Sequence, residues 1–278
     1  MIWTHVFEEL SPDTEGAFVT LVRNILGGPL AAPVFMICLG IGISFSKKNT
    51  PKDLLYRGIS LLKIGLLLNL VRYVLPDFIK YALTNDSAYL YDTFALFSVD
   101  ILQFAGLAFL FLAAAKKLKL KYPALLLIGV ATSLLGMSLR WIETDSYVIN
   151  QFIGLLWGTK TATFFPFLNW IIFPISGMAF GLLMQHCRDK KGFYLYMTPL
   201  CAGLMIIYLI LTIVYGFMFT SSGAYYFLGL FDAVFFTIFA LMCFGVHYGL
   251  LQLFPKVQFK ILMRWSKNTT IFFVSIGR

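Results

Sequence analysis

Few side chains in this sequence are suited to acid–base chemistry, and the first of them is a histidine near the amino end. His5 stands in the stretch MIWTHVFEEL, after an apolar start and before two glutamates. Because imidazole titrates near neutral pH, His5 is the natural general base for activating a hydroxyl or amine nucleophile. Such a base needs a carboxylate to orient it, and Asp100 and Asp232 are the candidates. The alternative is an ordinary histidine at a helix end.

Asp100 and Gln103 form a second polar group, within the otherwise apolar stretch FSVDILQFAGLAFLF. Their spacing of three positions predicts that both lie on one face of a helix. Ionisable groups inside a membrane span are costly and usually face a protein interior or a water-filled cavity. We therefore expect Asp100 either to form a structural ion pair with Arg72 of the preceding helix or to belong to a site with Gln103.

The elements that position these groups must be membrane helices. Of the 278 residues, 59% are hydrophobic and 13% are charged, whereas soluble domains carry about 25% charged residues. The sequence predicts an all-α, polytopic integral membrane helical bundle, forming a single domain over 1–278. Apolar runs of about 20 residues can each cross a bilayer. They predict about eight membrane helices plus the tail of an earlier one at 1–7: 30–46, 54–75, 94–115, 122–140, 164–184, 196–221, 230–254 and a last one that begins near 261.

Local signals mark several boundaries of these helices. Thr50 can cap the second helix, and Pro51 suits its first position. Pro174 lies in the middle of the expected helix 164–184 and should kink it. Gly177 and Gly181 follow in a GxxxG pattern, which permits close contact between helices.

Basic segments alternate along the chain with segments that are poor in Lys and Arg. Because basic loops stay on the cytoplasmic side of a membrane, we place four loops in the cytoplasm: 47–57, 116–121, 185–195 and 255–267. Residues 1–29 and the loops 76–93, 140–163 and 222–229 are then extracytoplasmic. This multi-pass topology in a cell membrane explains the net charge of +9 as an orientation signal. The lipid bilayer is therefore the expected partner, and no nucleic acid is.

Five stretches, taken in order, resemble the transmembrane acyltransferase superfamily, which includes the acyltransferase 3 family and the heparan-α-glucosaminide N-acetyltransferase-like proteins. They are GGPLAAPVFMICLGIGISF, LLYRGISLLKIGLLLN, DILQFAGLAFLF, FFPFLNWIIFPISGMAFGLLM and RWSKNTTIFFVSI. The first helix of those proteins carries a basic residue and then a histidine. His5 matches the histidine, and the basic residue would precede Met1. The resemblance thus implies a domain that is incomplete at both ends.

The resemblance also implies an enzyme, an acyltransferase without a metal. Acetyl or another short acyl group would move from a cytoplasmic acyl-CoA, such as acetyl-CoA, to a hydroxyl or amine of an extracytoplasmic acceptor. That acceptor would be a cell-surface glycan or glycolipid. His5 would act as base or acyl carrier, supported by Asp100 and Gln103.

The family interpretation gives the cytoplasmic basic loops a possible second role. Lys47, Lys48 and Arg57 would hold the phosphates of the acyl-CoA, with Lys116 and Lys117 as the alternative set. The positive-inside bias alone explains these residues equally well.

Two other functions fit the same polar residues. A transporter or flippase would also place Asp, Arg and His within its spans, although such proteins usually show inverted repeats, and none is visible here. A non-catalytic membrane partner, such as a subunit of a glycan assembly complex, is the second alternative.

Overall fold

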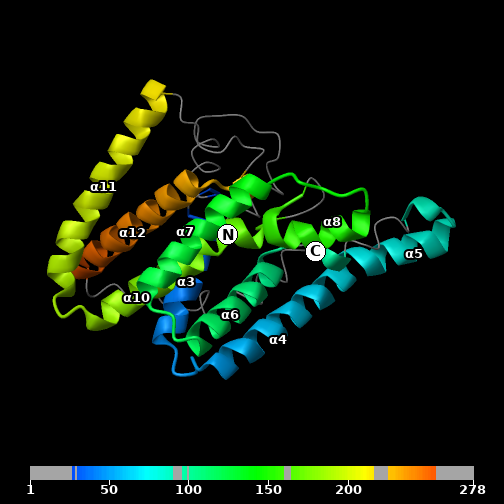
Figure 1. Ribbon diagram of the computed structural model, residues 1–278, viewed down its shortest axis with the longest axis horizontal. Helices are drawn as coiled ribbons and strands as arrows, with labels where there is room; N and C mark the ends of the chain where they lie inside the picture. The colour runs from blue at the N-terminus through cyan, green and yellow to red at the C-terminus, as the bar shows by residue number, and fades with distance from the viewer. Residues whose placement is uncertain are drawn as a thin grey trace. The chain divides into compact units, whose positions relative to one another are not determined.

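The computed structural model describes residues 27–28, 30–89, 96–98, 100–159, 164–215 and 225–254, and all regular elements in these ranges are helices (Figure 1). The all-helical prediction is confirmed for this part of the chain. Five helices are long and apolar enough to cross a membrane: Pro51–Thr84, Tyr122–Leu139, Phe167–His186, Lys190–Leu211 and Leu230–Leu253. The count of about eight stays a prediction, because segments 1–7 and 261 onwards lie outside the described residues.

The chain divides into two compact units. Unit 1 comprises 1–35, 184–219 and 234–278, and unit 2 comprises 36–183 and 220–233. The α-helices are α3 (Ala32–Phe45), α4 (Pro51–Asn69), α5 (Leu75–Thr84), α6 (Ile101–Lys117), α7 (Tyr122–Leu139), α8 (Tyr147–Trp157), α9 (Phe167–Trp170), α10 (Ile172–His186), α11 (Lys190–Tyr215) and α12 (Leu230–Leu253).

Helix α4 begins where its capping residues predicted. Thr50 is the N-cap, Pro51 opens the helix, and Asp53 completes a capping box with Thr50. The predicted cytoplasmic loop 47–57 is therefore too long at its carboxyl end, because its second half is already helical. Two further predicted cytoplasmic loops are also shorter than expected: 116–121 is reduced to 118–121 between α6 and α7, and 185–195 to 187–189 between α10 and α11. The fourth predicted loop, 255–267, lies outside the described residues.

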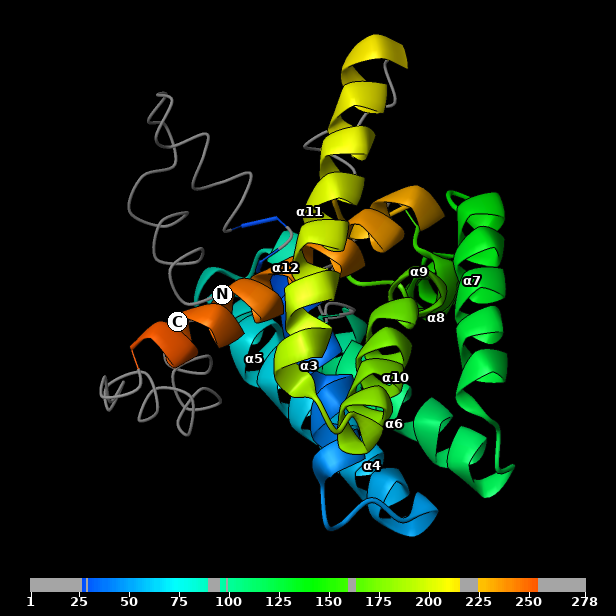
Figure 2. The same ribbon diagram turned by 90° about the vertical axis from the view of Figure 1, so that its left-hand side faces the viewer.

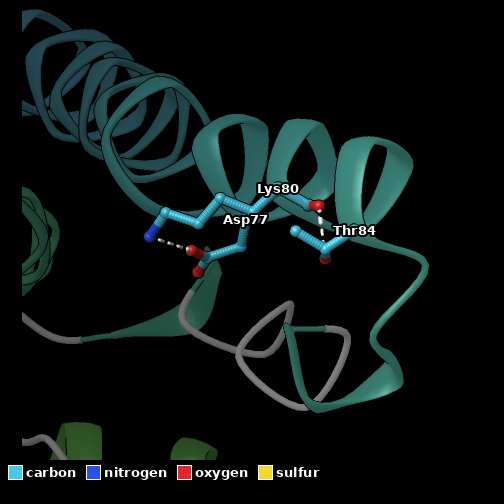
Figure 3. A network of polar contacts seen from close by, with 3 residues as sticks. All are labelled: Asp77, Lys80 and Thr84. Atoms are coloured by element: carbon cyan, nitrogen blue, oxygen red, sulfur yellow. Dashed lines mark hydrogen bonds and ion pairs between the residues drawn. The ribbon is translucent and has the colours of Figure 1, made fainter.

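The expected extracytoplasmic loop 76–93 is wrong in its first half, which is helical. A π-helical turn, Leu70–Val74, joins α4 to α5 in one rod of 34 residues (Figure 1). The N–H of Leu75 bonds to the Leu70 carbonyl, and this wider turn accommodates the ring of Pro76 without ending the helix. Further along, Lys80 pairs with Asp77 at 3.3 Å and its carbonyl accepts the Thr84 hydroxyl at 2.8 Å (Figure 3).

Glycines bring α3 and α10 into close contact within unit 2 (Figure 2). A Cβ atom at Gly177 would overlap the carbonyl of Ile37, and one at Gly40 would overlap the carbonyl of Pro174. Ser44 donates a 2.9 Å hydrogen bond to the Met178 carbonyl at the same interface. The packing role predicted for the GxxxG pattern is confirmed.

The helix expected at 164–184 is interrupted, as its internal proline predicted. It begins at Phe167, and Ile171 separates α9 from α10. Pro174 cannot donate to the carbonyl four residues earlier, that of Trp170, and its ring crowds that carbonyl. The interruption therefore falls directly beside the residue whose hydrogen bond is lost.

Helix α8 lies where an extracytoplasmic loop, 140–163, was expected. Ser146 caps its start by accepting the N–H of Ile149, and Gly158 ends it with a φ of 86°. The helix has 11 residues. Apolar runs of about 20 residues, the length that crosses a bilayer, could therefore not predict it.

Unit 1 contains an antiparallel contact between α11 and α12. The rings of Tyr194 and Tyr248 stack with centroids 4.5 Å apart, and those of Tyr208 and Phe235 also lie 4.5 Å apart. Because the early residue of α11 meets the late residue of α12, the two helices run in opposite directions.

Candidate functional site

Polar side chains gather where the end of α4 meets the start of α6. Asn69 is buried, and its amide donates to the carbonyls of Leu96 and Ser98 at 2.9 and 2.8 Å. Together with Asp100 and Gln103, these residues form what we name the α4–α6 polar cluster: Asn69, Ser98, Asp100 and Gln103. The two helices lie side by side (Figure 1).

Asp100 and Gln103 interact with each other, but in a different way from the prediction. Helix α6 begins at Ile101 and not near 94, so Asp100 is its N-cap and not a residue within its span. The Asp100 carboxylate accepts the N–H of Ile101 at 2.6 Å, and Gln103 Oε1 accepts the N–H of Asp100 at 3.2 Å. Their spacing of three therefore makes a capping box.

The expected ion pair between Arg72 and Asp100 is wrong, since the two side chains form none among the described residues. Arg72 is exposed, and its guanidinium lies 5.2 Å from the ring centroid of Tyr73. Asp100 satisfies its carboxylate locally by capping α6, so it does not require a cation from the neighbouring helix.

Gln103 retains one buried hydrogen-bond donor. Its side chain is 5% exposed, and Nε2 has no hydrogen-bond acceptor among the described residues. Gly65 of α4 lies against this amide, and a Cβ there would stand 2.9 Å from Gln103 Cδ. A buried unsatisfied donor costs free energy, so Gln103 Nε2 is the atom of this cluster whose hydrogen-bonding capacity is unused among the described residues.

A second cluster lies where the α3–α4 connection meets the carboxyl end of α6. Lys47 and Lys48 are exposed in this connection, and Arg57 of α4 donates to the Ser46 hydroxyl at 3.4 Å. The Lys116 ammonium donates to the Asn49 carbonyl at 2.8 Å. Desolvation lowers the pKa of Lys116. The structure thus places Lys47, Lys48 and Arg57 at one connection. Lys116 holds that connection through its hydrogen bond to the Asn49 carbonyl.

Three further buried polar groups were not predicted from the sequence as site residues. Ser133 Oγ, Gln151 Nε2 and Asn169 Oδ1 have no hydrogen-bond partner in the described part of the chain. They lie on α7, α8 and α9, and these three helices contact one another. The available signal was a polar residue within an apolar run, as in ATSLL or INQF.

His5 lies outside the described residues, so its distance to the α4–α6 polar cluster is not part of this geometry. Within the described ranges, no group of three or more His, Cys, Asp or Glu side chains could hold a metal ion. The chemistry that the described clusters can supply is hydrogen bonding from amides and charge pairing from Lys and Arg.

Comparison with known proteins identifies the family. A family model described as "Heparan-alpha-glucosaminide N-acetyltransferase, catalytic" matches residues 1–210. No curated protein and no solved structure gives a match. The matched range contains His5, the basic α3–α4 connection and the α4–α6 polar cluster. The chain therefore belongs to the family of the heparan-alpha-glucosaminide N-acetyltransferase catalytic domain, a family of N-acetyltransferases.

Proposed function

We propose that this protein transfers acetyl or another short acyl group from a cytoplasmic acyl-CoA to a hydroxyl or amine of an extracytoplasmic glycan. The observation that carries the proposal is the family match over residues 1–210, which includes every candidate site residue. The apolar helices support a multi-pass membrane protein, in which donor and acceptor approach from opposite sides.

His5 is the proposed general base. Its imidazole takes the proton from the acceptor O–H or N–H, and the acceptor oxygen or nitrogen attacks the thioester carbonyl carbon. The new C–O or C–N bond replaces the C–S bond. The thiolate of coenzyme A leaves and recovers the proton from the imidazolium, so the products are the acylated glycan and the free thiol.

The α4–α6 polar cluster supports this step in the proposal. The Asp100 carboxylate orients and stabilises the charged imidazole, while Gln103 Nε2 offers a hydrogen bond to the thioester oxygen as negative charge develops on it. The capping box between the two residues holds both side chains in one arrangement.

The basic α3–α4 connection is the proposed donor site. Phosphate groups of an acyl-CoA pair well with Lys47, Lys48 and Arg57. Arg57 is held by its hydrogen bond to Ser46, and Lys116 fixes the connection through Asn49. We therefore assign Lys116 a positioning role, and the three other basic residues the contacts to phosphate.

Contacts between segments assigned to the same side agree with the proposed sidedness. Lys116 and Asn49 come from two segments assigned to the cytoplasm, and they meet. Arg140 and Phe227 come from two segments assigned to the exterior, and they also meet, at 3.1 Å.

An assay with sealed vesicles tests the proposal. Vesicles that contain the protein receive acetyl-CoA, labelled in its acetyl group, on the cytoplasmic side. They receive methyl α-D-glucosaminide on the other side. Covalently labelled saccharide, absent from vesicles without the protein, is the expected product. Movement of unmodified saccharide or coenzyme A across the membrane, without labelled product, would instead show a transporter. If the vesicles show neither acyl transfer nor transport, that result would favour a non-catalytic partner.

A further inference from the structure

The turn after α7 places a tryptophan in an unfavourable backbone conformation. Trp141 has a φ of 72°, in the left-handed region that bulky residues rarely occupy because of steric conflict. Burial does not explain the residue, because its side chain is 39% exposed. A strained residue whose side chain remains at the surface points to a function for that side chain.

Four contacts hold the turn in place. The N–H groups of Trp141 and Ile142 donate to the carbonyls of Gly158 and Leu139. The indole of Trp157 donates to the Ile142 carbonyl at 3.2 Å, and Arg140 donates to the Phe227 carbonyl at 3.1 Å. The strained conformation is therefore fixed by its surroundings.

The indole of Trp141 is also supported from one side. The ring of Phe227 lies with its centroid 4.3 Å away and is itself buried against Gly158, where a Cβ would overlap it. The Arg140 guanidinium lies 5.8 Å from the Trp141 centroid. The Phe227 carbonyl is its one hydrogen-bond acceptor among the described residues, so other N–H donors of its five remain available.

We propose that Trp141 and Arg140 bind the acceptor sugar and that the buried ring of Phe227 supports the indole from behind; we name these three residues the Trp141 platform. The apolar face of a pyranose ring stacks on the indole, and the sugar hydroxyls accept hydrogen bonds from Arg140. The inference rests on the proposed function, because the topology assigns this turn to the side where the acceptor arrives.

The opposing explanation is that Trp141 is an aromatic anchor at the membrane interface, where Trp and Tyr are common. An anchor does not require a left-handed backbone, and its loss would not change affinity for a sugar. Tyr122 lies at the other end of α7 and is exposed, so it is the matched control for anchoring.

The test is Trp141→Gly in the full chain, with methyl α-D-glucosaminide as acceptor. Glycine accepts the left-handed conformation, so we expect the melting temperature to be maintained. The acceptor KM should rise about tenfold, the scale of one aromatic contact. The kcat and the KM for acetyl-CoA should stay the same, Trp141→Phe should restore most of the acceptor affinity, and Tyr122→Ala should change none of these values.

An unchanged acceptor KM in Trp141→Gly would overturn the platform while leaving the proposed function intact. If the wild-type protein transfers no acetyl group, the proposed function fails, and calorimetric titration with the same saccharide then tests the platform. Binding by the wild-type protein that Trp141→Gly loses would uphold a sugar site; equal binding, or none by either protein, would overturn it.

Discussion

The indole nitrogen of Trp170 donates a 2.6 Å hydrogen bond to the backbone carbonyl of Tyr226, although 56 positions separate the two residues. Arg140 and Asn169 bond the next two carbonyls, those of Phe227 and Leu228. Three successive carbonyls are therefore held by side chains from the carboxyl end of α7 and from α9. This arrangement fixes the segment that supports Trp141.

Replacing Trp170 by phenylalanine removes the first of these bonds and reduces the volume of a fully buried side chain. We expect the free energy of unfolding to fall by about 2 kcal/mol, because a partly buried carbonyl loses its donor and a small cavity opens. Unfolding in mixed detergent measures the change. Trp157→Phe, which loses an exposed bond to Ile142, should cost less than about 1 kcal/mol. If both variants lose the same free energy of unfolding, the Trp170 bond contributes no more than the exposed Trp157 bond.

Substitutions at Asp100 separate its capping role from its proposed role beside His5. Asparagine can still cap α6, so Asp100→Asn should keep the free energy of unfolding within about 0.5 kcal/mol, whereas Asp100→Ala should lose about 1 kcal/mol. If the charge orients His5, kcat falls roughly tenfold or more in both variants. Wild-type kcat in Asp100→Asn would show that Asp100 is a cap and nothing more.

The contact between α3 and α10 predicts a sharp difference between two glycines. Gly177→Ala places a methyl group against the Ile37 carbonyl and should lower the free energy of unfolding by about 2 kcal/mol or more. Gly42 of α3 has nothing within 4 Å of an added Cβ, so Gly42→Ala should stabilise the helix by roughly 0.5 kcal/mol. A tolerated Gly177→Ala would mean that the helices pack less closely than described.

The donor site is tested by Lys47→Ala combined with Lys48→Ala. Loss of two charge-assisted contacts should raise the KM for acetyl-CoA roughly tenfold or more, because one such contact contributes about 1.5–3 kcal/mol. The effect should weaken at high salt. Lys190→Ala with Lys191→Ala removes the same charge from another segment that the charge pattern assigns to the cytoplasm, and should leave this KM unchanged. Equal effects of the two pairs would indicate a general surface charge.

Local chemistry made the cap of α4 and the interruption near Pro174 predictable, because each depends on residues close in sequence. Helix α5 was missed because Pro76 resembles a stop signal, and the π-helical turn that accommodates it leaves no pattern in the sequence. Helix α8 was missed because, with 11 residues, it is shorter than a membrane span. Apolar periodicity could not show that Asp100 precedes α6, since a cap and a residue within a helix have the same spacing to Gln103. The bonds to residues 226–228 depend on tertiary packing, which spacing along the chain does not reveal.

The most direct test of the account is acetyl transfer by His5→Ala in vesicles, compared with wild-type protein at equal folded amount. As the general base, His5 should contribute roughly a hundredfold to ten-thousandfold to kcat, while the KM for acetyl-CoA should change little. A fall in kcat of that size, with an unchanged melting temperature, is the predicted result. Transfer at the wild-type rate would contradict the central claim, because the acceptor would then lose its proton without His5.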